Sequence, residues 1–259
     1  EIAKKRLRAL LPNVFAAEKL FIRPLTEERR CSMAELWSTE PINAEIFVSH
    51  SWTEDFGEFI QGLTRFAVSL TFRESPALPQ DAAAMHARGC SFFIHAFSDS
   101  MWSDDKGKSL EDLPVYQTLA NSNIKTVLLS TGLDGTSLLR AWCCVELFLA
   151  KEFQRAVVLN TRLGPMQDQS GPSALTTDIK QFAAMLVEAI IPEMDVERAQ
   201  ATKEEEKSLL LSYLQQGGSP LQRFMQLRQN NAEVICSQSL AILVQNGSAP
   251  LVQHALSLR

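Results

Sequence analysis

The chain has 259 residues, of which 46% are hydrophobic, and 30 acidic against 25 basic side chains give it a net charge of −5. This length can bury a full core and fits one or two domains. The acidic balance argues against a nucleic-acid partner, because phosphate neutralisation needs a basic excess. No stretch reaches the roughly 18 consecutive apolar residues of a membrane-spanning helix, so we expect no membrane span.

The cysteines point to a reducing compartment. There are five of them, an odd number, with no CxxC spacing. Cys143 and Cys144 are neighbours in a helical pattern, where successive side chains diverge, so they are poorly placed to bond each other. We therefore expect reduced thiols and a cytoplasmic protein.

The chain begins with a predicted N-terminal helical extension over residues 1–40. It contains helical patterns at 2–11 and 33–37, separated by Pro12 and Pro24. No chemistry can be assigned to this extension.

An α/β domain is predicted over residues 41–165, where short apolar runs alternate with helical patterns. This alternation is typical of βαβ crossovers and a parallel sheet. The predicted strands are 44–49, 91–97, 126–130 and 156–160. The predicted helices are 53–70, with Thr53 as its cap, 81–87, 110–121, and 137–152, with Thr136 or Ser137 as its cap.

A C-terminal helical region is predicted over residues 166–259. Apolar residues recur there at helical spacing, with breaks at Gly217-Gly218 and Asn246-Gly247. The predicted helices are 179–190, 204–214, 220–228, 232–243 and 250–258. A fifth strand is predicted between residues 193 and 199.

The helix predicted at 137–152 carries an acid in an apolar stripe. Leu139, Trp142, Glu146, Leu149 and Phe153 share one of its faces, because they are spaced by three or four residues. An acid in such a stripe must be partnered, neutralised or used. The structural interpretation is an ion pair between Glu146 and a nearby arginine, either Arg140 or Arg155.

The sequence Arg140-Ala-Trp-Cys-Cys-Val-Glu-Leu147 resembles the Trp-Cys-x-x-Glu-Leu signature of TIR domains, the Toll/interleukin receptor and resistance protein family. Glu45-Ile-Phe-Val-Ser-His-Ser51 is similar to the first strand of that family, and the order of elements over residues 44–160 matches as well. His50 departs from the family pattern, and the loop at 98–109 lacks the Gly and Pro pattern of well-studied members. The resemblance implies a flavodoxin-like doubly wound parallel sheet of four or five strands, in the order 2-1-3-4.

In family members that hydrolyse NAD, the Glu of this signature is catalytic, so the resemblance implies that Glu146 is the catalytic residue. A doubly wound sheet binds ligands at the carboxyl ends of its strands, where the strand order reverses. Candidate NAD-binding residues at this edge are Ser49, His50, Trp52 and Trp142. Each Trp has two interpretations, because an indole can stack on a nicotinamide or adenine ring or simply fill the core.

A single carboxylate suits cleavage of the nicotinamide–ribose bond. The leaving group is a pyridinium that departs neutral, so it needs no general acid, and one carboxylate can stabilise the oxocarbenium-like ribose. NAD is then a substrate, and no cofactor is expected. The four histidines show no metal-ligand spacing, so no metal site is expected either.

These observations predict a TIR-like NAD+ nucleosidase that acts in intracellular signalling or defence. The resemblance implies that it works when self-associated or when bound to other TIR domains. One alternative is a non-catalytic TIR-like adaptor that acts through protein–protein association. Another is a sensor that binds a nucleotide without turnover.

Overall fold

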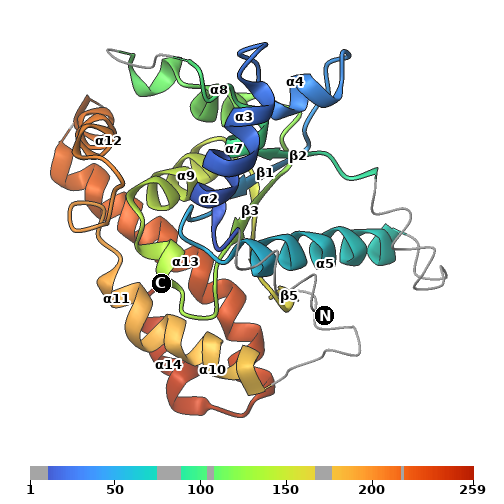
Figure 1. Cartoon of the computed structure of the whole chain (residues 1–259). Helices are drawn as coiled ribbons and strands as arrows, with labels where there is room; N and C mark the ends of the chain where they lie inside the picture. Colours follow the sequence, from blue (N-terminus) through green and yellow to red (C-terminus); the bar gives the residue numbers. More distant parts are fainter. Residues whose placement is uncertain (1–10, 75–88, 104–107, 167–176, 217–218) are drawn as a thin grey trace.

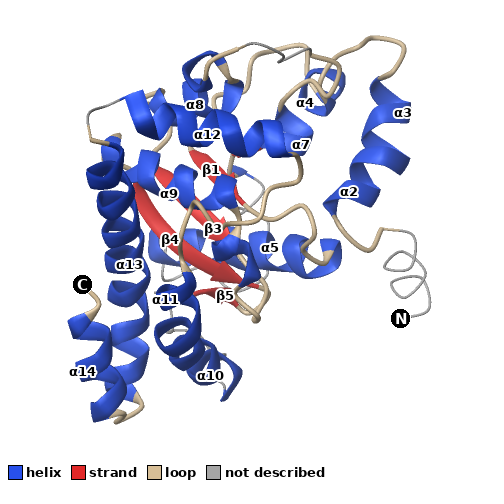
Figure 2. Cartoon of the chain, turned by 90° about the vertical axis from the view of Figure 1, so that its left-hand side faces the viewer, coloured by secondary structure: helices blue, strands red, loops and turns tan. Residues whose placement is uncertain are grey.

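The computed structural model describes residues 11–74, 89–103, 108–166, 177–216 and 219–259. A central sheet is covered by helices on both faces, and a group of helices from the C-terminal part of the chain lies beside it (Figures 1 and 2). The predicted α/β class, with a helical C-terminal region, is confirmed. No helix in the described ranges is both long enough and apolar enough to cross a bilayer.

The sheet has five strands in the order β2-β1-β3-β4-β5. The first four are parallel, and β5 runs antiparallel to β4. Their bounds are β1 Ile46–Ser49, β2 Phe92–Ile94, β3 Thr126–Ser130, β4 Ala156–Thr161 and β5 Gly164–Pro165. The predicted order 2-1-3-4 is therefore confirmed, and the order reverses between β1 and β3.

Two strand predictions are corrected. β2 ends at Ile94 because helix α7 (His95–Ser98) begins there, and the backbone N–H of Ile94 donates to Ser98 Oγ at 3.1 Å. No strand forms between residues 193 and 199. The next residue, Gln200, makes a single β-bridge with Arg140. The fifth strand is instead β5, which Gly164 allows by turning the chain with a φ of 104°.

One face of the sheet packs against α5 (Phe56–Glu74), whose buried side chains include Phe59, Leu63 and Phe66. Asp55 Oδ1 accepts from the backbone N–H of Glu58 at 2.8 Å, so the cap is Asp55 and the prediction of Thr53 was wrong. Thr53 instead pairs with Ser51, at 2.8 Å between their hydroxyl oxygens.

The other face packs against α9 (Ala141–Glu152), which is buried on nearly all sides. The single helix predicted from residue 137 is divided: a 3-10 turn, η4 (Thr136–Leu139), precedes α9, and Arg140 between them is extended. The division follows from pairing with Gln200, whose backbone bonds both Leu139 and Ala141. Neither Thr136 nor Ser137 caps α9. Before β3, the predicted helix 110–121 forms as η3 (Leu110–Asp112) and α8 (Pro114–Ala120).

The N-terminal part packs on the α5 side of the sheet. α2 (Val14–Ala17), the π-helical η1 (Glu18–Ile22) and α3 (Arg23–Thr26) run on without a gap, so Pro24 lies inside this helical run and does not separate two helices as predicted. α4 (Met33–Trp37) forms where predicted, with Ser32 and Glu35 as a capping box. The helix predicted at 2–11 and the one at 81–87 lie almost wholly outside the described residues.

The C-terminal helices bond directly to the sheet layer. From α13, the Gln238 side chain accepts from Leu159 N at 2.7 Å and donates to Val157 O at 2.9 Å, while Asn231 donates to Cys144 O. The helices are α10 (Thr177–Met185), η5 (Leu186–Ile190), α11 (Ile191–Glu193), α12 (Glu204–Gln216), α13 (Pro220–Gln245) and α14 (Ala249–Ser257). The predicted helices 220–228 and 232–243 are one helix, α13.

Candidate active site

Two neighbouring strands end in serine at the reversal of strand order. Ser49 is the last residue of β1 and pairs in register with Leu129, so Ser130, the last residue of β3, lies one position further along. Both serines are buried, as are His50 and Asn160 at the same edge of the sheet. This carboxyl edge therefore buries polar side chains, each of which needs a partner.

Glu146 lies on α9 against this edge and is only 7% exposed. Ser49 Oγ donates to Glu146 Oε2 at 2.5 Å. Burial raises the pKa of Glu146 to about 7, while the bond from Ser49 and the nearby His95 act in the opposite direction. At neutral pH the carboxyl is thus poised between its two protonation states.

Neither Arg140 nor Arg155 neutralises Glu146, so the predicted ion pair with one of them is wrong. Arg140 donates to Thr202 Oγ1 at 2.8 Å. Arg155 instead donates to backbone carbonyls at the end of α8, including those of Leu119 and Ala120. A neutral hydroxyl is what partners the acid, and this leaves its charge available for a ligand.

Cys143 shares the surroundings of Glu146. The Cys143 thiol also bonds with Ser49, and burial raises its pKa well above the usual range, with Glu146 acting in the same direction. The thiol is therefore protonated and unreactive at neutral pH. It forms part of the wall around the carboxyl.

A second carboxyl at the same edge was missed by the sequence analysis. Ser130 Oγ donates to Glu54 Oε1 at 3.1 Å, and Glu54 Oε2 is buried with no hydrogen-bond partner in the described structure. Burial is the main cause that raises the pKa of Glu54 to about 8; the nearby Asp134, Glu58 and Asp55 act in the same direction, and the bond from Ser130 acts against them. The available signal was that two strands each end in serine, with an acid a few residues after the first.

His50 is a neutral imidazole. Burial is the main cause that lowers its pKa to about 4. Its ring lies 4.6 Å from that of Phe59, and Nδ1 lies 3.4 Å from the carbonyl oxygen of Ser51. Nε2 is buried and unpartnered among the described residues. His50 therefore offers an uncharged hydrogen-bonding atom at this edge.

Asn160, at the end of β4, is fully buried, and neither atom of its amide has a partner in the described ranges. Helix α5 approaches it closely at Gly62: a Cβ there would lie 2.9 Å from Asn160 Nδ2 and 2.8 Å from Thr161 O. Glycine is therefore required at position 62, because no larger residue fits between α5 and β4.

The two predicted tryptophans lie in different places. Trp52 stays at the carboxyl edge, partly exposed, with its ring 5.2 Å from that of Phe15 and 5.8 Å from that of His95. Trp142 directs its indole N–H to Glu206 on α12, at 3.3 Å. Ser49, His50, Trp52 and Glu146 thus lie at one edge, whereas the polar end of Trp142 is turned toward the C-terminal helices.

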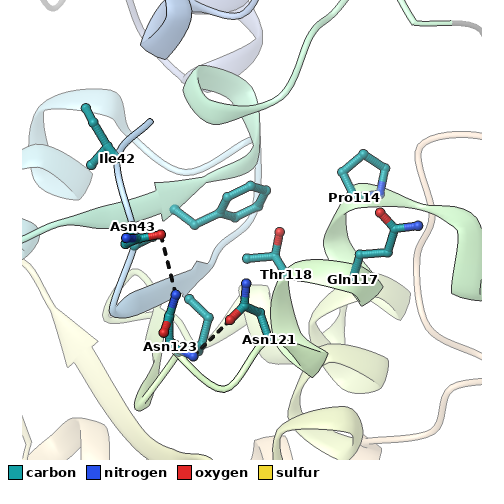
Figure 3. Close-up of a pocket in the computed structure, with 10 residues that line it drawn as sticks. Ile42, Asn43, Pro114, Gln117, Thr118, Asn121 and Asn123 are labelled. Carbon is teal, nitrogen blue, oxygen red and sulfur yellow. Dashed lines mark hydrogen bonds between the residues drawn. The ribbon is translucent and has the colours of Figure 1, made fainter. Parts of the chain in front are cut away.

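An open hollow lies at the opposite, amino edge of the sheet and contains none of these residues. It is lined by the segments that precede β1 and β3 and by α8, and several side-chain amides face it (Figure 3). Asn123 Nδ2 donates there to Asn43 Oδ1 at 3.4 Å, and Asn121 Oδ1 accepts from the backbone of Asn123. These amides have partners, and none of the residues that line the hollow has an acidic or basic side chain for proton transfer.

The fold and site define a doubly wound α/β protein with two buried carboxyls at its topological switch point. No three His, Cys, Asp or Glu side chains gather as a metal site within the described ranges. Comparisons of the chain with family models, with curated proteins and with solved structures gave no match. The function must therefore be argued from the site itself.

Proposed function

We propose that this protein is a TIR-like NAD+ nucleosidase that cleaves the nicotinamide–ribose bond. The observation that carries the proposal is Glu146, a buried carboxyl at the switch point of a doubly wound sheet whose partner is a serine hydroxyl. Ligands of such sheets bind at this point. A carboxyl with no cationic partner can stabilise a cationic substrate.

The chemistry follows from the charge of the leaving group. Nicotinamide leaves NAD as a neutral molecule, so positive charge builds up on the ribose alone. In its ionised form Glu146 would stabilise that charge, and substrate binding favours ionisation because NAD brings a pyridinium cation into the site. Ser49 would hold the carboxylate in place, while His50 and Trp52 would contact the nucleotide.

A non-catalytic adaptor is the second candidate, and two observations favour it. Glu146 is only 7% exposed, so a ligand must displace part of its surroundings to reach it. Large apolar side chains are also exposed on the N-terminal helices, notably Phe21 and Trp37. Such surfaces suit protein–protein association. Self-association or binding to other TIR domains is therefore part of both proposals. Both proposals also place the protein in the cytoplasm.

The test is an assay for free nicotinamide after incubation of the concentrated full chain with NAD. We expect release by the wild type and a loss of about a hundred- to a thousandfold in Glu146→Gln, the usual cost of removing one electrostatic stabiliser of a transition state. The amide of Gln can still accept from Ser49, so the variant should fold. Glu152→Gln on the same helix is the matched control, because Glu152 bonds Arg223 away from the site.

Each other outcome has a defined meaning. Equal release by the wild type and by Glu146→Gln would remove Glu146 from the chemistry. Binding of NAD without release would identify a sensor. If the chain neither binds nor cleaves NAD but self-associates, as measured by light scattering, the adaptor is correct.

A further inference from the structure

Two carboxyls reach the carboxyl edge from opposite faces of the sheet. Side chains alternate along a strand, so Ser49 lies on the face of Phe47, in the core formed with α9, and bonds Glu146. By the same alternation Ser130 lies on the face of Leu128, in the core formed with α5, and bonds Glu54. Because β1 and β3 are adjacent, the two acids flank the ends of the same pair of strands.

The two carboxyls are in different protonation states. Glu54 has its pKa raised to about 8, and the charged groups acting on it are all acids, Asp134, Glu58 and Asp55. It is therefore largely protonated at neutral pH. Ser130 donates to Oε1, so the proton belongs on Oε2, the atom that is buried and unpartnered. Glu54 presents an acid proton that no described protein group accepts.

A protonated carboxyl is not needed for cleavage of NAD, whose leaving group departs neutral. It is needed for ribosides of ordinary nucleobases, because an unprotonated purine would have to leave as an anion. Glycosidases that cleave sugar–oxygen bonds use paired carboxyls in this way, one protonated and one ionised. The second acid therefore extends the range of leaving groups that the site can handle.

We propose that Glu54 is a general acid that allows this site to hydrolyse purine nucleotides as well as NAD. The proposal rests on the proposed function, because it assigns to Glu146 the same role toward the ribose. In the reaction the bond from C1′ to the purine nitrogen breaks, and its electron pair stays with the base. The proton of Glu54 Oε2 moves to a ring nitrogen of the purine, and the carboxylate of Glu146 stabilises the cationic ribose.

Water completes the balance. Its oxygen bonds to C1′, and the proton that it releases restores the acid form of Glu54. The net reaction is nucleotide plus water giving free base plus ribose phosphate, with no oxidant, reductant or other reactant.

The test compares two substrates in one preparation of the full chain. AMP and NAD are incubated in parallel, and the release of adenine and of nicotinamide is measured by chromatography. We expect the wild type to release both bases. In Glu54→Gln, the ratio of adenine release to nicotinamide release should fall on the order of a hundredfold, the scale of general acid catalysis.

Glu152→Gln is the matched control, because it removes a carboxylate that bonds Arg223 away from this edge and that is not among the groups acting on Glu54. The ratio should not change in this variant. The wild type provides a second measurement that does not depend on the folding of a variant: the ratio should fall as the pH rises above about 8, because Glu54 then loses its proton.

The outcomes separate this proposal from the one on which it rests. Release of nicotinamide without adenine would overturn the role of Glu54 and leave the NAD nucleosidase standing. A ratio that is unchanged in Glu54→Gln, or that is independent of pH, would also overturn it. If neither base is released, both proposals fail.

Discussion

The two edges of the sheet differ in how their polar groups are satisfied. At the carboxyl edge, His50, Glu54 and Asn160 each bury at least one polar atom that has no partner within the described structure. At the amino edge, the amides of Asn43 and Asn121 bond to Asn123, and the surroundings are open (Figure 3).

The open hollow and the titratable buried groups therefore lie at different edges of the sheet. The hollow is at the amino edge, but the carboxyls with raised pKa values are at the carboxyl edge. Buried polar atoms without partners cost free energy, so a protein retains them where they serve a ligand or a reaction. The proposed function therefore rests on the carboxyl edge, and we predict a structural role for the amino edge.

The largest expected effect contrasts one variant from each edge. Glu146→Gln should raise the activation free energy of nicotinamide release by roughly 2.7–4 kcal/mol. Gln117 is an exposed residue that lines the hollow, and Gln117→Ala should leave the rate unchanged. Steady-state rates with NAD measure both. If Gln117→Ala lowered the rate and Glu146→Gln did not, the active site would be at the hollow.

A structural role for the amino edge predicts a loss of stability without a loss of rate. Arg155, just before β4, donates to the backbone carbonyls of Leu119, Ala120 and Asn121 at the end of α8. Arg155→Ala should lower the free energy of unfolding by about 1.5–3 kcal/mol, the scale of hydrogen bonds from charged groups. Urea unfolding measures this loss. The rate with NAD, measured well below the melting temperature, should match the wild type.

Ser49 should affect how the rate of NAD cleavage depends on pH. The bond from Ser49 lowers the pKa of Glu146, so Ser49→Ala should raise that pKa above about 7. In the proposed mechanism the ionised carboxylate is the active form, so the acidic limb of the rate profile should move to higher pH, by about one unit for a hydrogen bond of ordinary strength. Ser51→Ala, in the next turn, should leave the limb in place. A shift to lower pH would contradict the role of Ser49.

The last prediction concerns the pH dependence of stability. In the folded chain Glu54 keeps its proton up to about pH 8, whereas the unfolded chain gives it up near pH 4.5. Its contribution to the free energy of unfolding therefore falls as the pH rises from about 4.5 to about 8. Glu54→Gln removes this loss. The melting temperature of the variant relative to the wild type should therefore rise between pH 4.5 and pH 8, by roughly 2–4 °C for each kcal/mol of unfolding free energy that the wild type loses.

The wild type is the required reference in this experiment, because His50 acts in the opposite direction. The folded chain binds a proton at His50 only near pH 4, so its contribution to stability rises with pH between about 4 and 6.5. Subtracting the wild-type curve removes the contribution of His50. A difference between variant and wild type that is the same at pH 5 and pH 8 would refute the raised pKa of Glu54.

The sequence predicted the strands and the burial of Glu146 because both depend on short-range patterns, whereas the order of the strands was implied by the resemblance to TIR domains. Apolar runs such as Thr126–Ser130 mark strands, and a three-to-four spacing places an acid on an apolar face. The helix boundaries were less accurate. Arg140 is extended because of a pairing with Gln200, which is 60 positions away and leaves no trace in local periodicity.

The second carboxyl was missed for a similar reason, because the serines at the two strand ends are only a weak signal for it. Glu54 resembles any acid before a helix, and its environment depends on Ser130, which is 76 residues further along the chain. The position of Trp142 also depends on a distant partner, Glu206. Polar contacts that link remote segments define the site, and a single sequence does not reveal them.

The contact between Phe15 and Trp52 has a practical consequence for anyone who shortens this chain. The backbone N–H of Phe15 donates to Trp52 O, and their rings meet edge to face. A recombinant piece that starts at β1 would lose this cover and leave the indole beside the carboxyl edge in water. Its activity would then describe an uncovered site, and its Trp52 fluorescence would report the change as a shift to the red.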